Sequence, residues 1–141
     1  MQLEVTTSGD SSPSAFAISE GMYWYLRSSF EKFSQETGIE IEIDGSAEIE
    51  AGCLLELFLT LEPVADAARS SSSETLKEVG LVDERNQIMM YETPREEGLA
   101  MIEGLMERAN DAYNEGNTLR IRGVEENQTG ELSRSLKRCS D

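Results

Sequence analysis

The sequence predicts an α+β fold, a two-layer sandwich in which a mixed or antiparallel sheet of about four to five strands carries its helices on one face. Short segments with apolar residues at every second position alternate with longer segments whose apolar residues recur every three or four positions. The polar positions of three short segments are charged, which predicts a solvated outer face on the sheet. The length fits a single acidic domain, residues 1–141.

The first strand and the first helix have distinct apolar patterns. Leu3 and Val5 alternate with polar residues, as in a strand with one buried face. A helix should follow, with Ser12 as its cap, Pro13 at its first position and Gly38 just after its end. The apolar stripe of this helix consists of Phe16, Tyr23, Leu26, Phe30 and Phe33.

Three further large side chains, Met22, Trp24 and Tyr25, flank that stripe. They make the helix apolar over more than one face, which a single sheet surface does not cover. The favoured interpretation is a helix buried between the sheet and neighbouring elements. The alternative is an aromatic docking surface for a partner or for a second copy of the chain, which would make a homodimer.

Two segments after this helix resemble strands. Isoleucines alternate with glutamates over residues 39–43, and Asp44-Gly45 then marks a turn. Residues 47–62 are open to two interpretations. Leucines recur at every second position from Leu55 to Leu61, whereas a helix here would be apolar on every side and would contain Gly52. The strand is favoured because it ends naturally before a proline.

The next part of the chain predicts a loop, a short helix and a strand. Residues 69–74 form a serine-rich loop, and a short helix is expected over 74–79 with Gly80 after it. A strand is expected over 87–92.

A long helix should begin at Thr93, which can form a capping box with Glu96 around Pro94. Gly116 should close it. Its inward stripe consists of Leu99, Ile102, Leu105, Met106, Ala109 and Tyr113.

The last predicted strand covers residues 118–122, with Leu119 and Ile121 facing the core. If it lies beside the segment 39–43, its two arginines would pair with glutamates across the sheet. A final helix is expected over 131–139, within a C-terminus that should fray over 126–141.

Charge limits the functions that the chain can have. The formal net charge is -16, and the chain contains no histidine, the commonest general base and metal ligand. Acidity of this size disfavours direct binding to nucleic acid or to anionic membranes and favours a basic protein partner. Glutamate pairs are too common among 28 acidic residues to indicate catalysis, so we do not expect an enzyme, a metal site or a cofactor.

The charge is concentrated in one window. Residues 33–68 contain nine carboxylates and neither lysine nor arginine. We expect this surface to bind a partner, together with the aromatic residues of the first helix. The candidate partner-binding residues are Glu40, Glu42, Asp44, Glu48, Glu50, Trp24 and Tyr25.

The sequence thus predicts an acidic protein-binding module, of the inhibitor or immunity type, that mimics nucleic-acid charge and engages a basic partner such as a nucleic-acid-processing protein. One alternative is a small structural or regulatory subunit that docks through its aromatic first helix. A second is a carboxylate enzyme without histidine, and a third is a surface that only aids solubility. The N-terminus lacks a basic and apolar leader, and we expect a cytoplasmic location.

Overall fold

The computed structural model describes residues 1–8, 16–81 and 88–125. Within these residues the chain forms three helices, a four-stranded antiparallel sheet and a two-stranded hairpin, which confirms the predicted α+β class. The elements are, in chain order, β1 (Gln2–Thr7), β2 (Phe16–Ser19), α1 (Glu20–Thr37), β3 (Ser46–Ile49), α2 (Ala51–Ser70), β4 (Thr75–Leu81), β5 (Ile88–Pro94), α3 (Arg95–Glu115) and β6 (Leu119–Val124).

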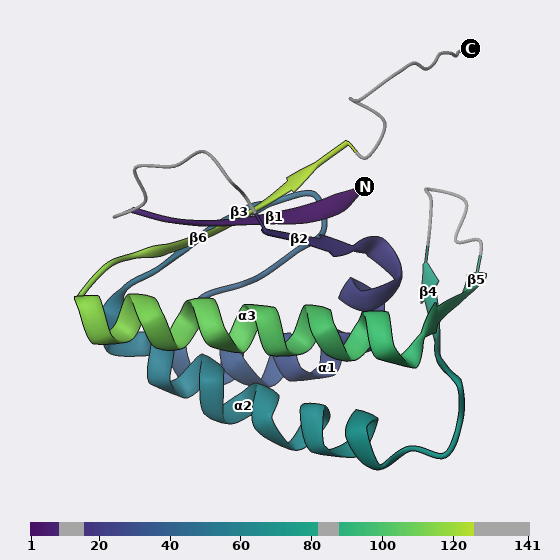
Figure 1. Ribbon diagram of the computed structural model, residues 1–141. Helices are drawn as coiled ribbons and strands as arrows, with labels where there is room; N and C mark the ends of the chain where they lie inside the picture. Colours follow the sequence, from purple (N-terminus) through teal and green to yellow (C-terminus); the bar gives the residue numbers. More distant parts are fainter. Residues whose placement is uncertain (9–15, 82–87, 126–141) are drawn as a thin grey trace.

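The helices cover one face of the sheet, whose strand order is β2-β1-β6-β3. Both α1 and α3 contact the sheet, and α2 packs on these two helices on the side away from it (Figure 1). The hairpin of β4 and β5 packs against α1 and α3. The side chains of Leu3, Val5, Leu119 and Ile121 point from the central strands into the core and are buried, as predicted.

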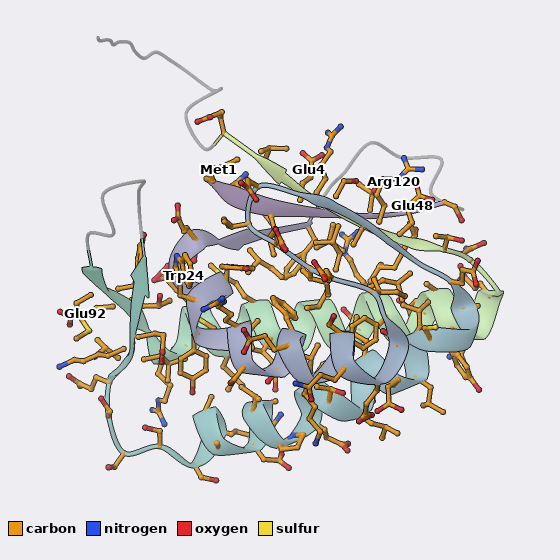
Figure 2. The ribbon with its side chains drawn as sticks, turned by 180° about the vertical axis from the view of Figure 1, so that it is seen from behind. Met1, Glu4, Trp24, Glu48, Glu92 and Arg120 are labelled. Atoms are coloured by element: carbon orange, nitrogen blue, oxygen red, sulfur yellow. The ribbon has the colours of Figure 1, made fainter. Side chains whose placement is uncertain are left out.

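The outer face of the sheet carries the predicted charges. The Arg122 guanidinium lies 2.9 Å from the Glu4 carboxylate, and that of Arg120 lies 3.1 Å from Glu48 (Figure 2). The arginines therefore pair with glutamates across the sheet, but these glutamates belong to β1 and β3 and not to the segment 39–43. These pairs are exposed, and each contributes only about 0.2 to 1 kcal/mol.

The first helix begins later than predicted. Ser19, and not Ser12, caps it, because the Ser19 hydroxyl accepts a hydrogen bond from the Met22 N–H at 3.3 Å. Phe16 belongs to β2 and pairs with Val5 of β1, so it is not part of the helical stripe. The other four stripe residues are buried on α1, and Gly38 ends the helix in the left-handed conformation. Residues 12 and 13 lie outside the described residues.

The predicted strand over residues 39–43 is wrong, although its alternation of buried and exposed side chains is correct. Ile41 is buried, and Glu40 and Glu42 are exposed, yet the segment pairs with no strand of the described sheet. The ladder with β6 starts only after Gly45, at β3. Alternation fixes which side chains face inward, but it does not supply a hydrogen-bonding neighbour.

The favoured strand over residues 47–62 is also wrong, because most of the segment belongs to the helix α2. Its buried residues follow the spacing of a helix, and they are Leu54, Leu57, Thr60, Leu61, Ala65 and Ala68. Leu55 and Leu59 remain 45% and 49% exposed, so the helix does have apolar residues on its outer side. Pro63 lies inside α2 on this exposed side, where water can satisfy the carbonyl that loses its helical hydrogen bond.

The short helix predicted over residues 74–79 is a strand, β4, which pairs antiparallel with β5. Leu76 is buried against Gly98 of α3, and this contact holds the hairpin on the helix. The strand predicted over 87–92 is confirmed as β5 with slightly later bounds. The serine-rich segment after α2 is mostly exposed, and the Ser71 carbonyl accepts a hydrogen bond from Arg95 at 2.7 Å.

The long third helix is confirmed, with three corrections. Its N-cap position is Pro94, without a side-chain cap, so the predicted capping box does not form. In the predicted stripe, Leu99 is only partly buried and Tyr113 is 43% exposed, while Ala112 is buried in its place. Gly116 ends the helix in the left-handed conformation, as expected. The helix expected over 131–139 lies outside the described residues.

We predict that Leu105→Ala lowers the free energy of unfolding by roughly 2 to 5 kcal/mol, because Leu105 is fully buried between α3 and the core. Leu59→Ala is the matched control, since it removes the same atoms from a half-exposed position and should cost less than about 1 kcal/mol. Urea titration measures both. Equal losses for the two variants would contradict the assigned packing of α3.

We predict that Gly123→Ala destabilises the protein by roughly 1 to 3 kcal/mol, because a Cβ atom at this position of β6 would overlap the carbonyl oxygen of Ile43. Gly52→Ala is the control, since a Cβ there meets open space on α2 and should stabilise the helix by up to roughly 1 kcal/mol. Urea titration should show opposite signs. Tolerance of Gly123→Ala would mean that the turn after residue 42 does not rest on β6.

Candidate functional site

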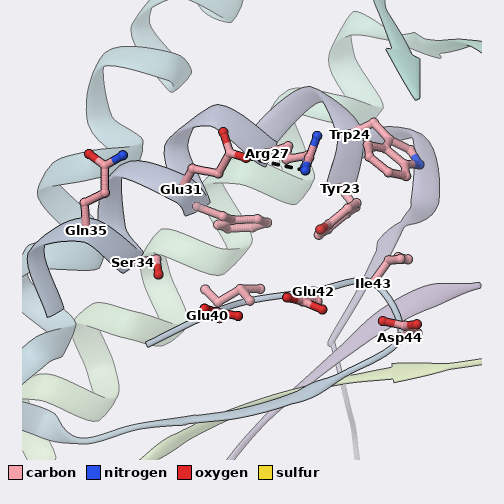
Figure 3. A pocket seen from close by; sticks show the side chains of 12 residues that line it. Tyr23, Trp24, Arg27, Glu31, Ser34, Gln35, Glu40, Glu42, Ile43 and Asp44 are labelled. Atoms are coloured by element: carbon pink, nitrogen blue, oxygen red, sulfur yellow. Dashed lines mark ion pairs between the residues drawn. The ribbon is translucent and has the colours of Figure 1, made fainter. Parts of the chain in front are cut away.

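An open groove of about 660 Å³ lies between α1 and the segment 39–44. We call it the α1 groove. In it, an aromatic residue and three acidic residues of the predicted site meet (Figure 3). The residues that line it are Tyr23, Trp24, Arg27, Phe30, Glu31, Ser34, Gln35, Glu40, Ile41, Glu42, Ile43 and Asp44.

One wall of the groove is a row of polar and aromatic side chains on α1. Residues 20, 24, 27 and 31 are spaced by four, three and four positions, which places them along one face of the helix. The Arg27 guanidinium lies 5.4 Å from the centre of the Trp24 ring and 3.5 Å from the Glu31 carboxylate. The helix therefore builds an acid, an indole, a guanidinium and a second acid in sequence.

Glu20 fixes the indole of Trp24 through a hydrogen bond. Its carboxylate accepts a hydrogen bond from Trp24 Nε1 at 3.3 Å and another from the Tyr91 hydroxyl of β5 at 3.1 Å. The amino group of Met1 lies 3.0 Å from the same carboxylate. Glu20 thus links the amino group of Met1, the indole of Trp24 and Tyr91 of the hairpin.

The same contacts control the ionisation of Glu20. Burial alone would raise its pKa, but the Met1 amino group and the hydrogen bonds from Trp24 and Tyr91 outweigh burial, so the pKa lies below its ordinary value. Glu20 is therefore stabilised as a carboxylate in the folded protein.

The opposite wall is the extended segment 39–44. Ile41 anchors it in the core, while the exposed carboxylates of Glu40 and Glu42 lie between the isoleucines and that of Asp44 follows Ile43. The end of the segment is fixed against β6, since the Gly123 N–H donates to the Gly45 carbonyl at 2.8 Å. This wall lacks strand partners on most of its length, and it is held by side-chain burial, by this contact and by hydrogen bonds of Ile39 with Thr37 and of Ile43 with Tyr23.

The base of the groove is aromatic. Tyr23 and Phe30 are 5% and 2% exposed, and the Tyr23 ring meets Trp24 edge to face at 5.1 Å between ring centres. Burial raises the pKa of the Tyr23 hydroxyl, and the charge of Arg27 together with a backbone hydrogen bond from Ile43 opposes that rise. Tyr23 therefore contacts both walls and packs behind the Trp24 indole.

The carboxylates of the second wall repel one another. A hydrogen bond with Glu40 and the negative charge of Glu40 raise the pKa of Glu42, and the charge of Asp44 adds to this effect. Arg27 acts in the opposite direction but does not cancel the rise. The wall therefore has more negative charge than the groove's own arginine neutralises, and an added cation would relieve the repulsion.

The structure brings four of the seven predicted site residues together, and they are Trp24, Glu40, Glu42 and Asp44. Tyr25 lines a smaller cavity of about 180 Å³ next to the groove, with which it shares Trp24, Arg27 and Glu31, and Glu78 of the hairpin also lines it. Burial and the Glu78 charge raise the pKa of its hydroxyl. Glu48 is paired with Arg120 on the sheet, and Glu50 precedes α2 without a capping bond.

Sequence reasoning did not select Glu20, Tyr23, Arg27 and Glu31 as site residues. The spacing of residues 20, 24, 27 and 31 along one helical face was a usable signal, because it places an arginine beside the single tryptophan of the chain. Tyr23 was assigned to the core stripe, where it does lie, and its second role at the base of the groove follows only from the position of the segment 39–44.

The groove presents fixed negative charge next to an aromatic face. This combination binds cations, and planar guanidinium groups in particular, because they stack on indole rings and form paired hydrogen bonds with carboxylates. Among the described residues, no group of three or more potential ligands is placed to hold a metal ion. None of the helices in residues 1–8, 16–81 and 88–125 is long and apolar enough to span a bilayer.

Comparison with known proteins gives no relative: no family model, no curated protein and no solved structure matches the chain.

We predict that Glu20→Gln destabilises the protein above its ordinary carboxyl pKa of 4.5 and that the difference from the wild type shrinks as the pH falls below this value. The sign follows from the lowered pKa, because the stability that an ionised Glu20 contributes is lost as it takes up a proton. Urea titrations between about pH 3 and pH 7, where the Met1 amino group stays charged, measure the effect. Glu62→Gln, at an exposed position of α2, is the control. A difference that is constant with pH would contradict the role given to Glu20.

Proposed function

We propose that the protein is an acidic binding module whose α1 groove takes up a cationic segment of a basic partner protein. The observation that carries the proposal is the convergence of Trp24 with Glu40, Glu42 and Asp44 in one groove. An inhibitor or immunity-type role fits this chemistry, since proteins that act on nucleic acids have basic surfaces that an acidic protein can cover.

The charge balance of the groove supports a cationic ligand. Four carboxylates line it, from Glu31, Glu40, Glu42 and Asp44, and Arg27 is the single cationic residue among its lining residues. The net charge of -16 on the whole chain would accelerate the approach of a basic protein over about one Debye length. Trp24 adds a buried contact of the kind that dominates protein interfaces.

A surface that only aids solubility is the main competitor for this interpretation. Such a surface needs charge but no concave shape and no oriented indole. In this protein the indole is held by Glu20 and by the edge of Tyr23, which is an arrangement that favours recognition over simple solvation.

The second candidate, docking of a subunit through the aromatic first helix, has less support. Met22 and Tyr23 are buried in the core, and the hairpin packs against the helix near Tyr25. The aromatic surplus of α1 is thus mostly covered within the same chain. A homodimer through the α1 groove is disfavoured, because it would bring two carboxylate-rich walls together. No arrangement of side chains in the groove supports the third candidate, a carboxylate enzyme.

The test replaces Glu40 and Glu42 by Gln and measures association with partner proteins that wild-type protein retains from the native cell extract at low salt. The double variant should lower the association rate by several-fold to about tenfold, while thermal stability stays level or rises slightly as repulsion is removed. Raising the salt should reduce the difference between variant and wild type.

The matched control is Glu36→Gln with Glu56→Gln. These two glutamates also form a repelling pair, in which the hydrogen bond with Glu36 raises the pKa of Glu56, but neither lines the groove. Both double variants remove the same charge. Equal slowing by the two would show that overall charge, and not the groove, drives association.

A further inference from the structure

We propose that the α1 groove recognises an arginine side chain of its partner, and that Arg27 holds the position of that arginine in the free protein. This inference rests on the proposed function and adds the identity of the recognised group. On binding, the partner's guanidinium would take the place above Trp24 that the guanidinium of Arg27 now covers.

The position of Arg27 is that of a ligand. Its guanidinium lies over the indole at 5.4 Å from the ring centre and beside the Glu31 carboxylate at 3.5 Å. Stacking on a ring together with pairing to a carboxylate is the contact set expected for a bound arginine. The position of Arg27 therefore indicates that the groove accommodates a guanidinium group.

The contacts of Arg27 with the indole and with Glu31 are weak enough to be exchanged, and its side chain also donates a hydrogen bond to the Tyr23 hydroxyl, which an incoming guanidinium can replace. The side chains of Arg27 and Glu31 are 51% and 58% exposed, and their separation of 3.5 Å exceeds that of a short charge-assisted hydrogen bond. Solvent screens such a pair, and long exposed side chains change rotamer readily. The indole, in contrast, stays fixed by Glu20 when Arg27 leaves.

The charge balance of the groove favours a second cation. One arginine faces four carboxylates among the lining residues, and those of Glu40, Glu42 and Asp44 lie on the wall opposite Arg27 (Figure 3). An incoming guanidinium can stack on Trp24 while its outer edge faces this wall. Arg27, once displaced, is still on α1 beside Glu31, so its charge need not be buried or left alone.

Arginine fits this site better than lysine. A guanidinium is planar, weakly hydrated and able to donate two parallel hydrogen bonds, whereas an ammonium group is strongly hydrated and lacks a flat face for stacking. The prediction is therefore a preference among basic peptides, and not only an attraction to positive charge.

The test uses two synthetic peptides that differ only in the basic residue, acetyl-Gly-Arg-Gly-Arg-Gly-amide and acetyl-Gly-Lys-Gly-Lys-Gly-amide. Trp24 is the single tryptophan of the chain, so its fluorescence reports on the groove directly. Wild-type protein should bind the arginine peptide several-fold more tightly than the lysine peptide, with a change in Trp24 emission.

Arg27→Gln should tighten binding of the arginine peptide by roughly three- to tenfold, because no internal guanidinium has to leave the indole. Arg120→Gln is the matched control, since it removes the same charge from the outer face of the sheet, outside the groove. Arg27→Lys keeps the charge and should tighten binding less than Arg27→Gln does. Circular dichroism establishes that each variant is folded.

Equal affinity for the two peptides, or an effect of Arg27→Gln no larger than that of Arg120→Gln, would overturn the inference. The proposed function would survive that result if both peptides still bound in a way that depended on Glu40 and Glu42. Binding of neither peptide, while partner association still depended on these glutamates, would likewise overturn arginine recognition alone. If neither peptide binding nor partner association depended on Glu40 and Glu42, the proposed function would be overturned as well.

Discussion

The groove depends on the burial of α1 on all sides but one. The helix contacts the sheet, α2 and the hairpin, and its Met22 and Leu26 are buried. Met22 and Leu76 of the hairpin both lie against Gly98 of α3. The strip from Tyr23 to Gln35 is left to face the segment 39–44. The hairpin thus explains why α1 is more apolar than a two-layer fold requires. The sequence patterns had assigned part of this hairpin to a helix.

The alternation of apolar and polar residues predicted orientation better than it predicted hydrogen bonding. In β1 and β6 both inferences held, because these strands lie next to each other in the centre of the sheet. In the segment 39–43 only the orientation held, since the place beside β6 is taken by β3, whose four residues have a weaker pattern. Several segments can compete for the same place beside a strand, and the pattern of one segment does not show which of them will pair.

The leucines of α2 show why residues 47–62 could not be decided from period alone. Leu54, Leu57 and Leu61 satisfy a helix, while leucines at every second position from 55 to 61 satisfy a strand, and both sets are present because the outer side of the helix is also apolar. Gly52 and Pro63, which argued against a helix, lie on exposed positions where their backbone costs are smallest. Length and leucine's helical preference outweighed the alternation.

The residue types of the candidate site were predictable from the sequence, but the particular residues that form it were not. With 28 acidic residues, pairs of glutamates in contact are common, and Glu36 with Glu56 is such a pair between α1 and α2, outside the groove. What sets Glu40 and Glu42 apart is their position opposite Trp24 and Arg27, which requires the turn at Gly45 to rest on β6. In the proposed function, negative charge would bring a basic partner to the surface and the fixed indole would select the cation that remains there. The second property depends on tertiary contacts, so composition alone does not reveal it.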